Sequence, residues 1–232
     1  MIFRQLFDPE SSTYTYLVAD PITREAALID PVLEQVDRDL GLVLELDLRL
    51  VHTLETHVHA DHVTGSGLLR ERTRCRVVAG AGGASCASIH VREGDAVNVG
   101  ALQLQVMATP GHTDDSVSYL LDDRVFTGDA LLVRGTGRTD FQNGDAGQLY
   151  DSITCKLFPL PDATLVYPGH DYRGHTVTTI GEERRCNPRL AHRDRAAFVQ
   201  FMGELRLPAP RKIDSAVPLN RACGRISAEP QV

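Results

Sequence analysis

The segment Thr56-His57-Val58-His59-Ala60-Asp61-His62 places three imidazoles and a carboxylate within six consecutive positions. It follows the apolar run 49–54, which predicts a buried strand. Imidazole nitrogens and carboxylate oxygens are the protein ligands of zinc, iron and manganese. In extended chain, residues two apart point the same way, so His57 and His59 face one point. The segment therefore predicts a metal site at the end of a strand.

Three further segments have the same form: an apolar strand, then small residues, then a side chain that can bind a metal. They end at His112, Asp129 and His170, and each of these residues follows a glycine. Glycine lets the backbone turn tightly, and sites in α/β proteins gather at the carboxyl ends of strands. We therefore expect seven side chains to converge on one metal site: His57, His59, Asp61, His62, His112, Asp129 and His170.

Strand and helix patterns alternate in both halves of the chain, and each half begins rich in strands. The predicted strands are 14–18, 26–29, 49–54, 75–79, 102–106, 117–121, 124–127 and 164–167. The predicted helices are 33–44, 63–73, 147–157, 177–185 and 196–205. This order favours an α/β sandwich of two packed sheets with helices outside. We expect one domain over 1–232, with a core of about 1–180 and a short helical extension of about 181–232, whose tail from Pro208 shows no pattern.

Composition narrows the classes of function. Of the 232 residues, 42% are hydrophobic and 24% are charged, as in globular proteins, and no run of 18 apolar residues predicts a membrane span. The net charge of −7 disfavours nucleic acid and anionic membranes as partners. Residues 1–8 lack the pattern of a secretory signal. The five cysteines are odd in number and form no C-x-x-C pair, so we expect free thiols and a cytoplasmic location.

The order of these motifs resembles the metallo-β-lactamase superfamily, from the first histidine cluster through two Pro-Gly-His segments. Three further stretches, 134–142, 167–172 and 187–190, resemble the persulfide dioxygenase family over nearly the whole chain. The resemblance implies an αββα metallo-β-lactamase-like fold. It also implies an enzyme that oxidises glutathione persulfide with O2 to sulfite and glutathione, and relatives often form homodimers. Glyoxalase II enzymes are similar, but they usually carry a longer helical C-terminal region.

The same resemblance implies a ligand set and a cofactor. One iron(II) per chain would be held by His57, His112 and Asp129. The remaining candidates would support these ligands or mark the remains of a second metal site: His59, Asp61, His62 and His170. Two histidines and one carboxylate leave coordination positions free for substrates.

Substrate contacts are expected near this centre. Glutathione carries two carboxylates, and guanidinium groups bind carboxylates in a two-pronged way, so Arg138 and Arg189 are candidates. Each has a structural ion pair as the alternative, and Arg138 could instead hold the loop that carries Thr136. Tyr172, two residues beyond His170, is the third candidate and would donate a hydrogen bond.

Two other functions stay open from the residues alone. One is a thiolester hydrolase of the glyoxalase II type, with two metals that activate a bridging hydroxide. The other is a metal-stabilised sensor without turnover. Structural zinc sites favour closed, cysteine-rich shells, which speaks against the sensor. Residue chemistry alone does not choose between one iron and two zincs.

Overall fold

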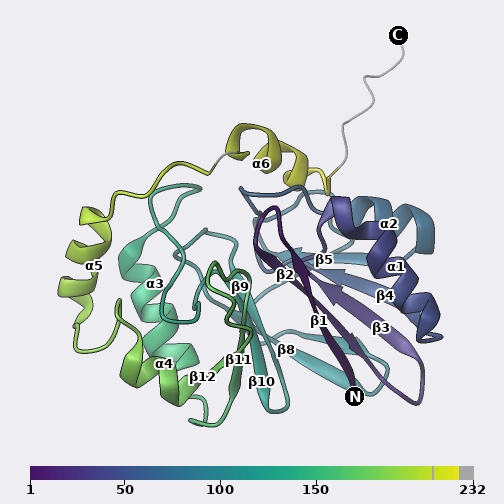
Figure 1. Cartoon of the computed structure of the whole chain (residues 1–232), viewed down its shortest axis with the longest axis horizontal. Helices are drawn as coiled ribbons and strands as arrows, with labels where there is room; N and C mark the ends of the chain where they lie inside the picture. Colours follow the sequence, from purple (N-terminus) through teal and green to yellow (C-terminus); the bar gives the residue numbers. More distant parts are fainter. Residues whose placement is uncertain (211, 225–232) are drawn as a thin grey trace.

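Two β-sheets pack face to face between layers of helices (Figure 1), in a computed structural model that describes residues 1–210 and 212–224. The strand order is β1-β2-β3-β4-β5-β6 in the first sheet and β12-β11-β10-β9-β8-β7 in the second. The αββα sandwich expected from the sequence is therefore confirmed.

The first sheet comes from the N-terminal part of the chain. Its strands β1 to β3 pair antiparallel, and β3 to β6 pair parallel. The parallel pairs β3–β4 and β4–β5 need crossover connections, which α1 and α2 supply. The elements are β1 (Ile2–Asp8), β2 (Thr13–Ala19), β3 (Glu25–Ile29), η1 (Leu33–Gln35), α1 (Val36–Glu45), β4 (Arg49–Leu54), α2 (Ser66–Thr73), β5 (Arg76–Gly80) and β6 (Ile89–Val91).

The second sheet is an antiparallel run from β7 to β10, to which β11 adds in parallel and β12 antiparallel. The crossover from β10 to β11 contains α3 and a π-helical turn, η2. The elements are β7 (Ala96–Val99), β8 (Leu102–Ala108), β9 (Val117–Leu121), β10 (Arg124–Gly128), α3 (Ala146–Ser152), η2 (Ile153–Leu157), β11 (Leu165–Pro168), β12 (Thr178–Thr179), α4 (Ile180–Cys186), α5 (Arg195–Glu204) and α6 (Ile213–Arg221).

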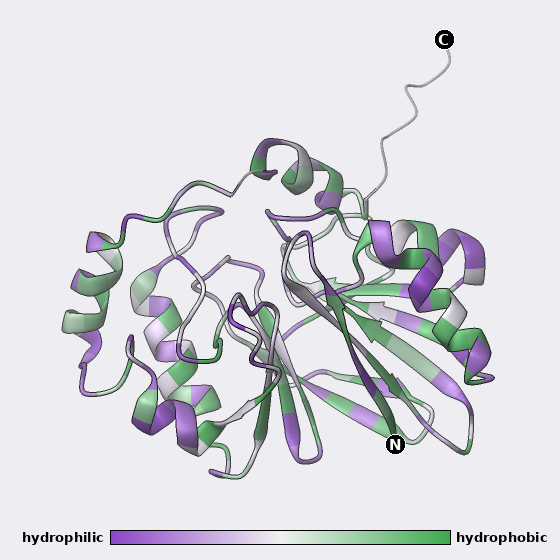
Figure 2. Cartoon of the chain, in the orientation of Figure 1, coloured by the Kyte–Doolittle hydropathy of each residue, from purple (hydrophilic) through white to green (hydrophobic). Residues whose placement is uncertain are grey.

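Successive side chains along each strand point to opposite faces of the sheet, and this divides the core into layers. On β2, Tyr14, Tyr16 and Val18 face the second sheet, whereas Leu17 and Ala19 face the helices of the first half. The apolar segments of the strands therefore lie in the middle of the molecule (Figure 2). Burying a side chain of this size contributes about 1.5–3 kcal/mol, so the sandwich is a rigid base for the loops at its rim.

Some elements differ from expectation. The sequence patterns did not single out β1, β6 or β7. The helix predicted from residue 177 begins at Ile180, because Thr178 pairs with β11 and Thr179 caps the helix by accepting a hydrogen bond from Glu182 N. The tail beyond Pro208 contains α6, whose internal Pro218 weakens the helical signal. The predicted division between a core and an extension near residue 180 stays a prediction.

The prediction of free thiols was wrong for two cysteines. Cys86 and Cys223 form a disulfide across 137 positions of sequence, whereas Cys75, Cys155 and Cys186 are free. Neither partner belongs to a local motif, so spacing could not reveal the pair. No helix among residues 1–210 and 212–224 has the length and apolar character needed to cross a bilayer.

Candidate metal centre

The predicted ligands follow the ends of three strands, one in the first sheet and two in the second, and they meet at one rim of the sandwich. His57 lies beyond β4, His112 beyond β8 and Asp129 directly after β10. Gly128 has a φ of +50°, and a Cβ there would lie 2.4 Å from the Thr56 hydroxyl. Only glycine therefore lets β10 deliver Asp129 this close to the loop that carries His57.

The three side chains predicted to bind the metal meet at one point. One ligand atom from each of His57, His112 and Asp129 lies within 4.8 Å of the others. His112 Nε2 and Asp129 Oδ2 are 3.7 Å apart, and the rings of His57 and His112 meet edge to face. Two imidazoles and one carboxylate make up the set. Such a trio suits a divalent cation.

Hydrogen bonds orient His112 for this role. Its Nδ1 lies 2.7 Å from the carbonyl oxygen of Arg138. A carbonyl only accepts, so Nδ1 carries the proton and Nε2 presents its lone pair to the site. The loop after Asp129 thus selects the tautomer that a metal ligand requires.

Hydrogen bonds that run from Asp30 through Thr56 to His57 form a relay that orients His57. The sequence patterns missed Asp30. Asp30 accepts hydrogen bonds from Thr56 N and Thr56 Oγ1, both at 2.7 Å. The hydroxyl oxygen of Thr56 is then free to accept from His57 Nδ1 at 3.0 Å. His57 Nε2 is left as the ligand atom. The available signal was that Asp30 directly follows β3, as the other site residues follow theirs.

His170 lies between two carboxylates and supports the centre. Its Nδ1 is 2.7 Å from Asp129 Oδ1, and its Nε2 is 2.9 Å from Asp61 Oδ2. Burial opposes a charge on this ring, but Asp129 and Asp61 outweigh it and raise the pKa of His170 well above its ordinary value. With both nitrogens bound to carboxylates, His170 orients Asp129 so that Oδ2 faces His112.

The rest of the histidine cluster lies beside the trio. His59 Nε2 is 3.1 Å from Asp30 Oδ1, and His62 Nδ1 is 2.9 Å from Asp61 Oδ2. His59, Asp61 and His62 form a second group whose ligand atoms lie within 4.8 Å. The Nε2 atom of His62 is buried without a hydrogen-bond partner among the described residues. The predicted supporting residues are thus all brought together.

A cavity of about 460 Å³ opens directly beside the trio. His112, Asp129 and His170 line it, together with residues 132–138. The three predicted substrate contacts line it as well: Arg138, Tyr172 and Arg189. Arg173, which the sequence patterns missed, joins them. The volume matches that of pockets for small ligands.

Arg138 and Arg189 have different partners. Arg138 forms a two-pronged pair with Asp140, at 2.6 and 2.8 Å, and donates to the Pro208 carbonyl. This arrangement favours the loop-holding role for Arg138. Arg189 donates to the Thr136 carbonyl at 2.7 Å and has no carboxylate partner among the described residues. Burial lowers the pKa of Arg189, so an anionic group in the cavity would gain most from pairing with it.

Tyr172 lies at the mouth of the cavity. Its ring is nearly parallel to that of His170, with centroids 6.1 Å apart, and 73% of the residue is exposed. The phenol is therefore accessible to a ligand that enters from solvent.

Comparison with known proteins now identifies the family. The metallo-β-lactamase superfamily model matches residues 8–85 and 88–170. The human protein "Persulfide dioxygenase ETHE1, mitochondrial" is 50% identical over 227 residues, which cover 97% of this chain and 89% of that protein. The chain belongs to the persulfide dioxygenase family of the metallo-β-lactamase superfamily.

A solved structure supports the same membership. The crystal structure of ETHE1 from Myxococcus xanthus is 69% identical, has a TM-score of 0.96, and covers 97% of this chain and 100% of that one. A hydroxyacylglutathione hydrolase of Nitrobacter hamburgensis is more distant, at 37% identity over 75% of this chain and 68% of the relative. The persulfide dioxygenase family thus matches more of the chain, and at higher identity, than this thiolester hydrolase does.

Proposed function

We propose that this chain is an iron(II)-dependent persulfide dioxygenase that oxidises glutathione persulfide with O2 to sulfite and glutathione. The observation that carries the proposal is the convergence of His57, His112 and Asp129 beside a cavity that opens to solvent. The relatives named above supply the reaction class, and membership in their family extends over nearly the whole chain.

The donor set fits the proposed iron. Two imidazoles and one carboxylate form the trio that non-haem iron(II) oxygenases use. The bonds from His112 to the Arg138 carbonyl and from His57 to Thr56 leave Nε2 of each ring deprotonated, as a metal requires. When bound, iron would bring dioxygen and the substrate sulfur together and exchange electrons with them.

The protein's own residues then hold the substrate. Arg189 would pair with a glutathione carboxylate inside the cavity, because none of the carboxylates among the described residues forms an ion pair with it. Tyr172 would donate a hydrogen bond at the mouth. His170 and Asp61 would keep Asp129 oriented. When the protein holds the persulfide in one pose, its sulfur need not meet dioxygen by chance in solution. This lowers the entropic part of the activation free energy.

The overall reaction balances without a further oxidant. One persulfide, one O2 and one water give one thiol and one sulfite. Both atoms of dioxygen and the water oxygen end in sulfite, and the thiol leaves with the inner sulfur.

The alternative is a two-metal thiolester hydrolase, and one observation favours it. His62 Nε2 is buried and has no hydrogen-bond partner within the described part of the chain, as a ligand of a second metal would be before binding. The same atom would also accept from an ordered water molecule. The supporting role of His59, Asp61 and His62 is therefore part of the proposal.

One experiment separates the two functions. The protein is purified without oxygen, its metals are counted, and dioxygen uptake is followed with glutathione persulfide. One iron per chain and rapid uptake support the dioxygenase. Two metals per chain with hydrolysis of S-lactoylglutathione would establish the hydrolase instead. The absence of both activities would point to a sensor.

Two further parts of the proposal concern the whole protein. We propose a cytoplasmic location and a homodimer, with no nucleic acid as partner because of the charge of −7. Light scattering on the purified protein tests the dimer, and fractionation of the source cells tests the location.

A further inference from the structure

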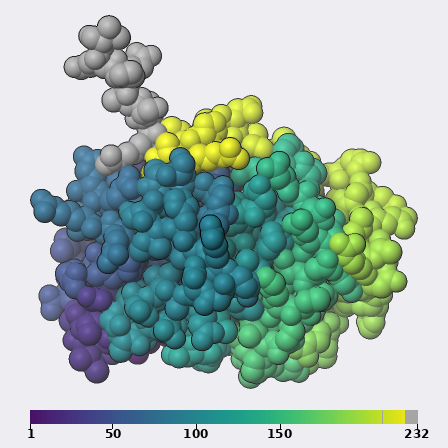
Figure 3. Space-filling model, turned by 180° about the vertical axis from the view of Figure 1, so that it is seen from behind, coloured from purple at the N-terminus to yellow at the C-terminus, as the bar shows by residue number. Residues whose placement is uncertain are grey.

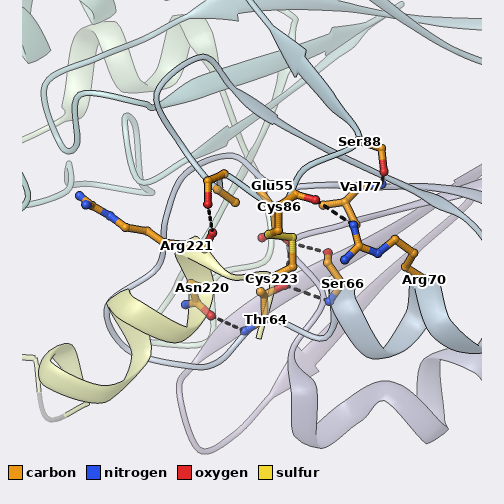
Figure 4. Close-up of a disulfide and its surroundings, with 12 residues drawn as sticks. Glu55, Thr64, Ser66, Arg70, Val77, Cys86, Ser88, Asn220, Arg221 and Cys223 are labelled. Carbon is orange, nitrogen blue, oxygen red and sulfur yellow. Dashed lines mark hydrogen bonds between the residues drawn. A yellow bond between two sulfur atoms is a disulfide. The ribbon is translucent and has the colours of Figure 1, made fainter. Parts of the chain in front are cut away.

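Asn220, on α6, is far in the sequence from the metal-binding loop, residues 55–65 between β4 and α2, but contacts it in the structure. Its side-chain Nδ2 donates to the carbonyls of His59 and His62, at 2.9 and 2.8 Å. Its Oδ1 accepts from Thr64 N at 2.8 Å (Figure 4). Asn220 is only 3% exposed, and the three hydrogen bonds that its side chain makes with described residues all go to this one loop. The loop has no regular secondary structure, so these bonds replace the ladder that a strand or helix would provide.

The C-terminal end of α6 is fastened to the first half of the molecule. Cys223 is bonded to Cys86, in the segment between β5 and β6. The carbonyl of Cys223 accepts from Gly67 N at 2.9 Å, and Ser85 Oγ donates to the Arg221 carbonyl at 3.1 Å. The disulfide lies directly beside the Asn220–Thr64 contact in Figure 4. The disulfide and these two hydrogen bonds therefore hold Asn220 against the loop.

The chain before α6 forms part of the cavity. Leu207, Pro208 and Pro210 line it, and the carbonyls of Leu207 and Pro208 accept from Arg138. Figure 3 shows α6, in yellow, lying on the surface across the junction of the two halves. One C-terminal segment thus contacts both the cavity wall and the backbone of the metal-binding loop.

The loop that Asn220 holds carries the supporting residues of the metal centre. Asp61 lies between His59 and His62, whose carbonyls Asn220 binds. Asp61 in turn binds His170, and His170 binds Asp129. A shift of the loop would therefore be transmitted through two hydrogen bonds to a predicted metal ligand.

We propose that Asn220 is a positioning residue of the metal centre, and that the Cys86–Cys223 disulfide keeps it in place, so that metal affinity depends on the oxidation state of this bond. The inference rests on the ligand assignment in the proposed function but not on persulfide oxidation. Removing a partner that orients ligands indirectly costs about 10–100-fold in metal affinity.

Reduction of the bond is chemically simple. One external thiolate attacks Cys86, which is partly exposed, and Cys223, which is buried, leaves as a thiolate. A second thiolate attacks the mixed disulfide, releases Cys86 and departs as an external disulfide. Two electrons and two protons thus convert the bond to two thiols, and the external thiols are oxidised in exchange.

The test measures cobalt(II) affinity of the metal-free protein by visible absorption. Asn220→Ala and Asn220→Asp should each weaken binding about 10–100-fold and alter the cobalt spectrum. The Thr64 amide should exchange with deuterium faster in Asn220→Ala. Ser215→Ala, an exposed change on the same helix, is the matched control and should bind within about twofold of wild type.

The disulfide is tested on the intact chain. A phosphine that is removed before titration reduces the bond and leaves as phosphine oxide. The reduced protein and the double variant C86S/C223S should both bind cobalt about tenfold more weakly. Reoxidation of the wild type should restore its affinity. Cys155→Ser, at an exposed free cysteine, is the control and should behave as wild type.

Separate outcomes would overturn the inference. A lower melting temperature with unchanged cobalt affinity would make Asn220 merely structural. If Asn220→Ala does not fold, Asn220→Asp and the reduced protein decide the question by the same measurement. Normal cobalt binding without dioxygen uptake would remove the proposed function and leave this inference intact.

Discussion

At the scale of single residues, hydrogen bonds to neighbours decide which atom of each histidine can bind a metal. Asp30 binds the Thr56 hydroxyl, and that hydroxyl accepts from His57 Nδ1. His112 Nδ1 donates a hydrogen bond to the Arg138 carbonyl. Neither arrangement involves a metal, so the ligand tautomers are preset before an ion arrives.

Replacing Thr56 by Val tests this relay. The variant keeps the shape but removes the hydroxyl, so Asp30 and His57 Nδ1 lose their common partner. We expect metal affinity to fall about 10–100-fold, as measured by iron(II) or cobalt(II) titration. Thr53→Val is the matched control, because the buried Thr53 hydroxyl has no hydrogen-bond partner in residues 1–210 and 212–224, so its removal should leave metal affinity unchanged. Equal affinities in the two variants would contradict the relay.

The two arginines in the cavity should respond differently to replacement by Lys. Arg189→Lys removes the planar group expected to bind a glutathione carboxylate, so KM for glutathione persulfide should rise about tenfold or more while kcat changes little. Arg138→Lys should leave KM nearly unchanged, because Asp140 already occupies that guanidinium. Steady-state dioxygen uptake measures both. A larger effect in Arg138→Lys would reverse the two roles.

At the scale of elements, strand ends position the centre while helices stabilise the sheets behind it. On α1 the buried positions are Val36, Asp39 and Val43, which places an acid on the apolar face. Arg38 pairs with Asp39 at 2.8 Å, yet Asp39 Oδ2 has no hydrogen-bond partner among the described residues. A buried carboxylate with one unsatisfied oxygen is costly when ionised.

The buried Asp39 on α1 predicts that the free energy of unfolding depends on pH. Burial raises the pKa of Asp39 to about 6, against the opposing effect of Arg38. The folded state therefore binds the Asp39 proton more tightly than the unfolded state does. The stabilisation that this proton gives to the folded state is lost as pH rises from about 4 to about 6. Urea unfolding should show Asp39→Asn gaining about 2 kcal/mol over wild type between pH 4.5 and pH 7. Asp37→Asn, at an exposed site, should follow wild type; parallel curves for all three would contradict the prediction.

At the scale of the whole molecule, the disulfide joins the segment between β5 and β6 to the residue beyond α6. It closes most of the chain into one loop, and such a closure restricts the unfolded state. Reduction should therefore lower the free energy of unfolding by about 2–4 kcal/mol, measured by urea on the metal-free protein. Cys155→Ser, treated with the same reductant, should lose the same amount. Identical urea-unfolding midpoints for the oxidised and reduced forms would contradict the prediction.

The sequence predicted the sandwich and the meeting of seven side chains, because both depend on local signals. Strand alternation and glycine-flanked ends are visible within a few residues, as around Asp129. Asp30, Asn220 and the Cys86–Cys223 pair were not predicted, since each acts through a partner more than 20 positions away. Arg138 shows a further limit: its residue type suits a carboxylate ligand, but Asp140 two residues later takes that role.

The cavity wall at Leu207, Pro208 and Pro210 follows β12, the last of the strands described above, in the sequence. During translation, every strand and all three members of the ligand trio leave the ribosome before that wall does. A nascent chain halted near α5 would hold the complete ligand trio beside an open basin. Synthesis therefore completes the ligand trio before it supplies the part of the cavity wall formed by Leu207, Pro208 and Pro210.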